Sequence, residues 1–288
     1  MDFYSLLIQL LNAVQYGLLL FLVASGLTLI FGIMGIINLA HGSFYMIGAY
    51  LAFSLASLTG SLLWAVLLGT VLAVALGLFL EWALFSRFYR REHLEQVLLT
   101  YGLILVFEEL RSLILGNDVH GVAVPAALSA SIPLTDTLSY PVYRLFMSGV
   151  CLVLAGGLYL LIQRTRVGMM IRAGSSNREM VQSLGLNINL VYRLVFALGV
   201  ALAALAGMIA APASSVYPGM GTQVLIICFV VVVIGGIGSV WGALLAALLI
   251  GLVDTFGKVF LPSISGLLVY LLMAVILLWR PEGLVKRT

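Results

Sequence analysis

Hydrophobic positions run almost unbroken through the first quarter of the chain. No Asp, Glu, Lys or Arg occurs from Phe3 to Leu80. A membrane-spanning helix needs about 20 mostly apolar residues, so this run is long enough for three crossings. A soluble domain of the same length would carry charged residues on its outer face. The pattern therefore predicts a series of membrane helices rather than the core of a soluble protein.

The rest of the chain continues the same pattern, with polar or glycine-rich stretches between apolar runs. We predict an all-α, polytopic membrane protein with eight or nine membrane segments. The predicted segments are 6–33, 43–58, 62–84, 96–115, 142–162, 194–212, 222–234, 240–256 and 264–279. The run 222–234 is too short for a full crossing at about 1.5 Å per residue. We expect it to form a broken or re-entrant element.

Composition agrees with a single membrane domain over residues 1–288. The chain is 63% hydrophobic and 9% charged, whereas a soluble protein has about 25% charged residues. No polar region is long enough for a soluble catalytic or nucleotide-binding domain. The first apolar run lacks the basic leader and the cleavage site of a signal peptide. Cys151 and Cys228 lie in apolar runs, where we expect them to be small buried hydrophobes.

The placement of basic residues predicts the topology. Of the 14 Lys and Arg residues, most fall into three clusters. The clusters are Arg87, Arg90 and Arg91; then Arg164, Arg166, Arg172, Arg178 and Arg193; and finally Arg280, Lys286 and Arg287. Short loops rich in Lys and Arg stay in the cytoplasm. The loop 116–140 has neither residue and should face the other side, as should the N-terminus, whereas the C-terminus should be cytoplasmic.

Two glycine-rich interruptions occur inside the apolar sequence, at 32–43 and 235–242. Irregular backbone at membrane depth is tolerated only where protein covers it or where it borders a water-filled cavity. Transporters place such breaks beside the substrate pathway, although glycines also serve close helix packing and tight turns. The candidate pathway residues are Asn38, His41, Gly42, Ser43, Gly235, Gly236, Gly238 and Ser239.

Asn38 and His41 make the first break chemically distinctive, because polar groups between apolar runs are costly unless they are paired. Their i, i+3 spacing would place both side chains on one helix face. Alternatively, Asn38 caps the following helix and His41 bonds to a neighbouring carbonyl group. A metal site is not expected, because His93 and His120 lie in distant loops and there is no Cys/His cluster.

Residues 164–192 form the longest polar stretch on the predicted cytoplasmic side. After Asn177, Met180, Val181 and Leu184 have the spacing of a short amphipathic helix, which Gly185 would end. A helix this short needs a surface to pack on. The physical pattern leaves two surfaces open, a partner protein or the lipid headgroups.

The remaining membrane-proximal charges are predicted to be structural. Glu108 and Arg111 lie three positions apart, and Asp254 and Lys258 lie four apart, so each pair is expected to form an ion pair on its helix. Glu81 lies near the cytoplasmic end of its segment. A short similarity between 48–52 and 242–246 suggests an internal repeat, but it is too weak to support a fold.

Four sequence blocks point to a family. Residues 26–50, GLTLIFGIMGIINLAHGSFYMIGAY, resemble the opening of branched-chain amino-acid ABC transporter permeases, the first of their two paralogous membrane subunits. Further blocks match in order over nearly the whole chain. They are Arg166-x-Gly-x-x-x-Arg-Ala with Asn177 and 184–187, then 233–239 with Gly242 and Ala243, and finally Arg280-Pro-x-Gly-Leu.

The resemblance implies that 164–192 is a cytoplasmic coupling loop whose helix sits in a groove of an ATP-binding subunit. The implied coupling residues are Arg166, Gly168, Arg172, Ala173, Asn177, Leu184, Gly185 and Asn187. It also implies a second homologous permease subunit and a periplasmic substrate-binding protein. The chain departs from the family in this loop, where Gly174, Ser176, Met180 and Val181 replace expected alanines.

These observations favour a permease subunit of an ABC importer in the bacterial inner membrane, moving amino acids, most of all branched-chain ones. The chain has no phosphate-binding loop, so we expect a partner subunit to bind the ATP. The chain itself is then expected to hold no cofactor and not to be an enzyme. Nucleic acid is not an expected partner. An importer for urea or short amides is the nearest alternative. A self-sufficient secondary transporter or channel is the alternative of another class, and an intramembrane enzyme has no supporting motif.

Overall fold

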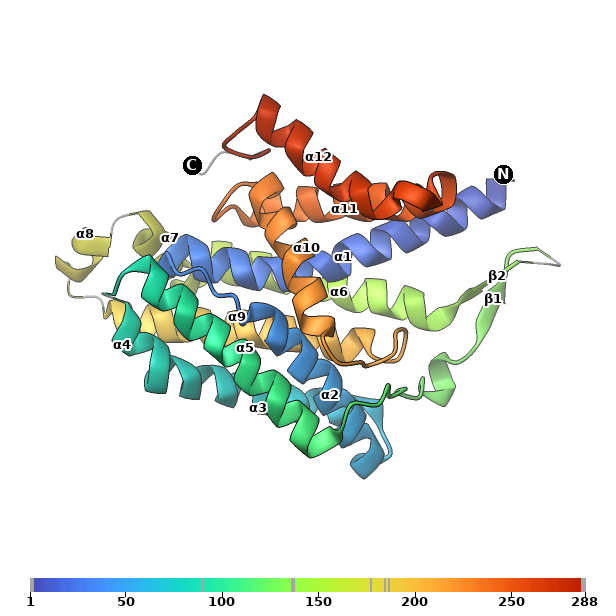
Figure 1. The fold of residues 1–288 in the computed structure, drawn as a ribbon, viewed down its shortest axis with the longest axis horizontal. Helices are drawn as coiled ribbons and strands as arrows, with labels where there is room; N and C mark the ends of the chain where they lie inside the picture. The colour runs from blue at the N-terminus through green and yellow to red at the C-terminus, as the bar shows by residue number, and fades with distance from the viewer. Residues whose placement is uncertain are drawn as a thin grey trace.

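The computed structural model describes residues 3–89, 91–135, 138–176, 178–183, 185 and 187–285, and it is almost entirely helical (Figure 1). The helices are α1 (Phe3–Met34), α2 (His41–Thr59), α3 (Leu62–Leu80), α4 (Ser86–Phe88), α5 (His93–Leu115), α6 (Val142–Arg164), α7 (Arg166–Ser176), α8 (Arg178–Ser183), α9 (Ile188–Ala210), α10 (Met220–Gly235), α11 (Val240–Phe260) and α12 (Ser265–Trp279). A π-helical turn (Glu81–Phe85) joins α3 to α4. Two short strands, β1 (Ser131–Pro133) and β2 (Ser139–Pro141), form an antiparallel hairpin.

The helices confirm a polytopic membrane fold. Within the described residues, seven helices are long and apolar enough to cross a membrane. Two of the predicted segments do not meet those criteria. The helix α5 has 23 residues but carries four charged side chains in its sequence, and α10 has only 16 residues. The predicted short run 222–234 is therefore a real helix, but it is shorter than its neighbours.

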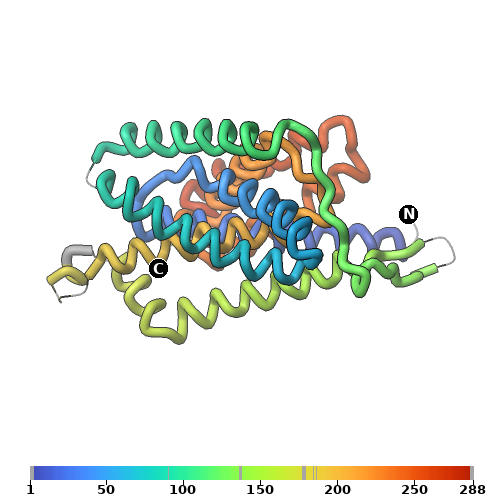
Figure 2. The backbone as a smooth tube through the Cα atoms, turned by 90° about the horizontal axis from the view of Figure 1, so that it is seen from below, coloured from blue at the N-terminus to red at the C-terminus, as the bar shows by residue number. Residues whose placement is uncertain are grey.

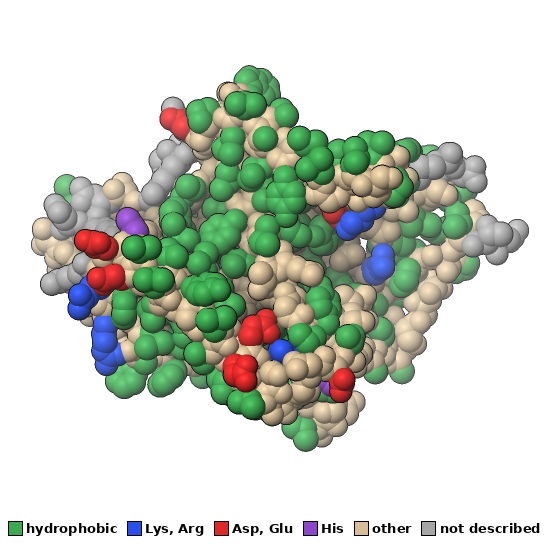
Figure 3. Space-filling model, in the orientation of Figure 1, with side chains coloured by type: hydrophobic (Ala, Val, Ile, Leu, Met, Phe, Trp, Pro, Cys, Tyr) green, Lys and Arg blue, Asp and Glu red, His purple; other side chains and the backbone are tan. Residues whose placement is uncertain are grey.

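The bundle is built around α1 and α9. In their most apolar stretches, 89% of the α1 residues and 78% of the α9 residues are buried, against 11% in the stretch that contains α12. Outer helices instead expose leucine, valine and tryptophan side chains, which give the surface in Figure 3 its large hydrophobic areas. In water this surface would be costly, whereas lipid tails solvate it.

Two groups of three helices run in opposite directions. The helices α1 and α3 run one way along the long axis and α9 and α11 run the other way, whereas α2 and α10 cross the bundle obliquely (Figure 1). The contacts match if α1, α2 and α3 correspond to α9, α10 and α11 in order. The first helix of each group packs along the third helix of the other group, and the two first helices, α1 and α9, pack along each other. This arrangement pairs α2 with α10. It does not pair the similar stretches 48–52 and 242–246, which lie on α2 and α11.

Glycines allow the central helices to touch backbone to backbone. A Cβ atom added to Gly26 of α1 would lie 2.7 Å from the carbonyl oxygen of Gly199 in α9. A Cβ atom on Gly42 of α2 would overlap the carbonyl oxygen of Gly221 in α10. Small residues at such crossings permit the close van der Waals packing that holds helices together in lipid.

The described residues of the basic clusters belong to segments at one end of the molecule. The α4–α5 turn, α7 and α8, and the C-terminus lie at the left in Figures 1 and 2. The N-terminus and the β1–β2 hairpin lie at the right in both views. The fold therefore places three segments that are far apart in sequence at the same end of the molecule.

The Gly42–Gly221 crossing gives a first prediction. Changing Gly42 to alanine should lower the thermal unfolding temperature of the detergent-solubilised protein, because overpacking a tight contact costs about 1–3 kcal/mol. Gly156→Ala in α6 is the matched control, since a Cβ atom there meets nothing within 4 Å and alanine favours helix by about 1 kcal/mol. Equal melting temperatures for the two variants would contradict the crossing.

Candidate functional site

The first break separates α1 from α2 at residues 35–40. Gly35 ends α1 with a positive φ of 68°, a conformation that glycine adopts without steric cost. The backbone then stays non-helical until His41 begins α2. The prediction that Asn38 and His41 share one helix face is therefore wrong, because Asn38 lies in the irregular link and His41 in the helix that follows it.

Both polar side chains of this break are fully buried, at 0% exposure. The Oδ1 atom of Asn38 accepts a hydrogen bond of 3.1 Å from the N–H of Ala40. The Nε2 atom of His41 lies 2.9 Å from the carbonyl oxygen of Val23 in α1. The Asn38 Nδ2 and His41 Nδ1 atoms have no hydrogen-bond partner within the described part of the chain. The expected bond from His41 to a neighbouring carbonyl group is confirmed. The expectation that Asn38 caps α2 is wrong, because the N-cap is Ala40 and no side chain caps this helix.

The second break, residues 236–239, joins α10 to α11. Gly236 and Gly238 have positive φ values of 96° and 83°. The Oγ atom of Ser239 accepts a hydrogen bond of 3.0 Å from the N–H of Gly242, which caps α11. The last turn of α1, just before the first break, lies against the second break, because a Cβ atom on Gly32 would lie 2.8 Å from the Cα atom of Gly238. Candidate residues from opposite ends of the sequence are therefore neighbours.

The C-terminal motif completes this meeting point. The N–H groups of Leu284 and Val285 donate to the carbonyl oxygens of Ile234 and Gly235, at 2.8 and 3.3 Å. A Cβ atom on Gly283 would lie 2.5 Å from the backbone nitrogen of Gly236. Sequence analysis treated the blocks around 235 and 283 as separate, and the structure makes them one unit. Their shared glycine content was the signal that could have linked them.

The polar stretch 164–192 contains two short helices rather than the single one that was predicted. The unpredicted α7 begins where the Oγ1 atom of Thr165 accepts a hydrogen bond of 3.0 Å from the N–H of Gly168. The Arg172 guanidinium donates to the carbonyl oxygen of Ile162 at the end of α6. Gly168 also packs on that carbonyl group. These contacts fold α7 back against α6 and give Gly168 and Arg172 a structural role.

On the surface of α7, Arg166 is exposed and Ala173 is half-buried.

The predicted amphipathic helix is observed as α8. Its residue Met180 is 62% exposed, whereas Val181 is 4% exposed. Gly185 follows with a positive φ of 80°, and its N–H donates to the carbonyl oxygen of Gln182 at 2.9 Å. The prediction that Gly185 stops this helix is confirmed. Asn177 and Leu184 lie outside the described residues.

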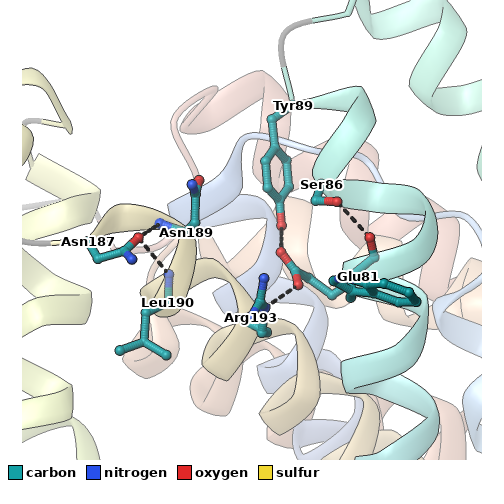
Figure 4. A network of polar contacts seen from close by, with 8 residues as sticks. Glu81, Ser86, Tyr89, Asn187, Asn189, Leu190 and Arg193 are labelled. Atoms are coloured by element: carbon teal, nitrogen blue, oxygen red, sulfur yellow. Dashed lines mark hydrogen bonds and ion pairs between the residues drawn. The ribbon is translucent and has the colours of Figure 1, made fainter.

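Asn187 caps the next helix, α9. Its Oδ1 atom accepts hydrogen bonds from the N–H groups of Asn189 and Leu190, at 3.1 and 3.3 Å (Figure 4). Asparagine is among the best residues for this purpose. The polar stretch therefore passes directly into α9, one of the two central helices.

A buried ion pair, which sequence analysis missed, ties the start of α9 to the end of α3 (Figure 4). Glu81 is 0% exposed, and its Oε2 atom lies 2.9 Å from Nε of Arg193. The Tyr89 hydroxyl donates to the other carboxylate oxygen. Burial raises the pKa of Tyr89, and its bond to Glu81 raises the pKa further, so this hydroxyl stays a donor. Glu81 begins a π-helical turn. Its partner Arg193 lies 112 positions away in the sequence, so short-range residue spacing could not predict the pair.

Two ion pairs at the opposite end were predicted correctly. Arg111 lies 3.2 Å from Glu108, and Lys258 lies 2.6 Å from Asp254. Cys151 and Cys228 are buried as expected, each at 0% exposure.

This geometry defines a polytopic helical membrane protein whose broken helices meet beside a folded polar segment. The family described as the branched-chain amino acid transport system permease component matches residues 9–277. The chain therefore belongs to this family, which confirms the resemblance seen in its sequence blocks.

Individual relatives match along nearly their whole length. The chain is 31% identical to the high-affinity branched-chain amino acid transport system permease protein BraD of Pseudomonas aeruginosa, over 99% of this chain and 97% of BraD. It is 28% identical to the corresponding protein LivH of Escherichia coli strain K12, with the same coverage.

Among solved structures, PsaBC from Streptococcus pneumoniae in complex with Fab matches with a TM-score of 0.50 and 12% identity, over 93% of this chain and 89% of that one. This likeness concerns the fold alone.

The buried ion pair gives a second prediction. Arg193→Ala leaves the Glu81 carboxylate buried without a cation and should lower the free energy of unfolding by about 2–3 kcal/mol. This cost is smaller than that of breaking a fully buried pair, because the arginine side chain is 41% exposed and partly screened by solvent. The double variant Glu81→Gln/Arg193→Ala should be more stable than this single variant, because no charge stays buried.

Thermal melting in detergent measures both effects. Arg91→Ala is the matched control, because its pair with Glu95 is exposed at 64% and 44% and should contribute less than about 1 kcal/mol. The interpretation is wrong if the double variant melts at or below the temperature of Arg193→Ala.

Proposed function

We propose that the protein is the permease subunit of an ATP-binding cassette importer that moves branched-chain amino acids into the cytoplasm. The observation that carries the proposal is the family match over residues 9–277. The names of its relatives supply the substrate class, because BraD and LivH are branched-chain amino acid permeases. These relatives are transport components rather than enzymes, and we assign no catalytic residue to this chain.

Energy for transport comes from a separate subunit in this proposal. The sequence contains no Gly-x-x-x-x-Gly-Lys-Ser/Thr phosphate loop, so ATP is bound by a cytoplasmic partner. The surface offered to that partner is α7 and α8, where Met169 and Met180 are 57% and 62% exposed. Exposed methionines on short helices suit an interface, because they adapt to the partner's shape.

Movement at α7 and α8 has a direct route into the membrane domain. The route passes through the Asn187 cap into α9, and through the pair of Arg193 and Glu81 into the end of α3. A rigid connection of this kind transmits a displacement rather than absorbing it. The partner's nucleotide cycle would then act on α3 and α9 together.

The two breaks are the proposed gate. They meet at the same end of the molecule as α7 and α8 (Figure 1), so a shift of the central helices changes their contact. The unpaired Asn38 Nδ2 and His41 Nδ1 atoms become available to the solute or to water when that contact opens. A second, homologous permease completes the passage, and a periplasmic binding protein delivers the amino acid at the opposite end.

The protein is a multi-pass protein of the bacterial inner membrane in this proposal. A cytoplasmic position for α7, α8 and the C-terminus is supported by their basic residues, because short loops rich in Lys and Arg stay on the cytoplasmic side. The N-terminus and the β1–β2 hairpin then face the periplasm, where the binding protein docks.

Met180→Asp tests the docking surface. A charge at an apolar contact should weaken binding of the ATP-binding subunits by about tenfold or more and reduce ATP-dependent leucine uptake in proteoliposomes accordingly. Val119→Asp is the matched control for binding of the ATP-binding subunits, since Val119 is 64% exposed in the loop at the opposite end. Co-purification of the ATP-binding subunits with Met180→Asp, together with wild-type uptake, would remove α8 from its assigned role.

A further inference from the structure

Three basic side chains lie outside the basic clusters, near the end of the molecule that carries the N-terminus. They are Arg111, Arg144 and Lys258. Arg111 is paired with Glu108, and Lys258 is paired with Asp254. Arg144 instead donates to an amide oxygen, Oδ1 of Asn12, at 2.7 Å. Within the described residues, no carboxylate lies within 4.0 Å of its guanidinium.

Arg144 and the Asp254–Lys258 pair border the same cavity. This cavity, which we call the outer cavity, has a volume of about 510 Å³ and lies between α1, α6 and α11. Its polar lining includes Asn12 and Gln15 from α1. Figure 3 shows basic and acidic side chains around a hollow next to α11 at the right of that face. Charged side chains from α6 and α11 and neutral amide side chains from α1 thus line one space.

Arg144 and Lys258 bring two positive charges to the outer cavity and Asp254 brings one negative charge, so its lining carries one excess positive charge. A guanidinium forms two parallel hydrogen bonds to a carboxylate, and such charge-assisted bonds are stronger than neutral ones. Arg144 has its amide contact in place but has no acidic partner among the residues that the structure describes. The group that the cavity lacks is therefore an anion of carboxylate type.

The neighbouring ion pair supplies the complementary charge. The Asp254 side chain is 15% exposed, whereas Lys258 is 63% exposed. The lysine ammonium can therefore move into solvent while the carboxylate stays in the cavity wall. A solute ammonium group can then take its place beside Asp254 with little net change in charge pairing.

Size and apolar lining agree with a small aliphatic solute. Pockets that bind small molecules have volumes of about 300–1,000 Å³, with mostly apolar walls and a few placed polar groups. The outer cavity has that volume, and Leu19, Met147 and Val259 add apolar surface beside the charged groups.

We propose that the outer cavity is a binding site for a zwitterionic α-amino acid, with the carboxylate on Arg144 and the ammonium on Asp254. This deepens the proposed function and rests on it for the direction of transport. The site lies at the end opposite to α7 and α8, where a periplasmic binding protein would release its cargo. The headgroup of phosphatidylethanolamine carries the same two charges, so the experiment must separate a free amino acid from a lipid.

The test is protection of a reporter cysteine at Ala213, which lines the outer cavity. The two native cysteines are 0% exposed and give little background. Maleimide labelling of Ala213→Cys is measured in phosphatidylcholine nanodiscs with increasing leucine or leucinol, which lacks the carboxylate. Ala123→Cys is the control, because Ala123 lines a different cavity that contains no charged residue.

We expect leucine, but not leucinol, to slow labelling of Ala213→Cys and to leave Ala123→Cys unchanged. Arg144→Gln should raise the leucine concentration for half-protection by about tenfold or more, because it removes a charge-assisted contact. Asp254→Asn should also raise it. Wild-type labelling rates without leucine in both variants would show that the cavity keeps its shape.

The proposal is overturned if leucine gives no protection, if leucinol protects equally, or if only added phosphatidylethanolamine changes the rate. Its failure is separable from failure of the proposed function. ATP-dependent leucine uptake without protection would remove the outer site and leave the importer in place. Protection without any uptake by the assembled complex would keep the site and contradict the importer.

Discussion

Close contact between helix backbones is the constraint on which this structure depends. In lipid, apolar side chains gain little by leaving the solvent, so helices associate through van der Waals contact and polar pairing. The glycine crossings between α1 and α9 and between α2 and α10 supply that contact. Larger side chains at these crossings would separate the central helices and with them the two breaks.

The same contact brings three irregular segments together. The last turn of α1 and the C-terminal turn both lie against the link between α10 and α11, and glycine provides the close approach in each case. Backbone groups in such links need partners inside the protein. The hydrogen bonds from Leu284 and Val285 to the end of α10 provide two of them. A gate built from these links is stable while closed, and its opening requires that these contacts be exchanged for others.

The buried pair of Glu81 and Arg193 gives the structure a second fixed point. A buried carboxylate is costly without a partner, so the end of α3 and the start of α9 are held in one position relative to each other. Since α9 continues directly from α7 and α8, the polar segment is joined to the centre of the bundle. In this account the glycine contacts are where the protein moves, and the ion pair is where it stays rigid.

Sequence could predict the parts of this fold that depend on local pattern. Apolar runs marked nearly every membrane helix within a few residues, and Gly185 was recognised as a helix end because its chemistry is local. Spacing predicted the pairs Glu108–Arg111 and Asp254–Lys258 for the same reason.

The meeting of Gly32 with Gly238, the role of Gly283 and the partner of Glu81 all depend on tertiary packing, which no spacing reveals. The shared helix face for Asn38 and His41 was wrong, because it assumed helical spacing across a break, whereas the alternative bond from His41 to a neighbouring carbonyl group was correct. The helix α7 was missed, because its start depends on the Thr165 cap and its packing on the end of α6.

The central claim is that this chain forms a gated passage driven by a separate ATP-binding subunit. Radiolabelled leucine uptake into proteoliposomes tests it most directly, with the chain alone and with the second permease, the ATP-binding subunits and the binding protein added. The account predicts uptake against a gradient only for the assembled complex with ATP. Leucine movement by the chain alone, without ATP, would contradict it.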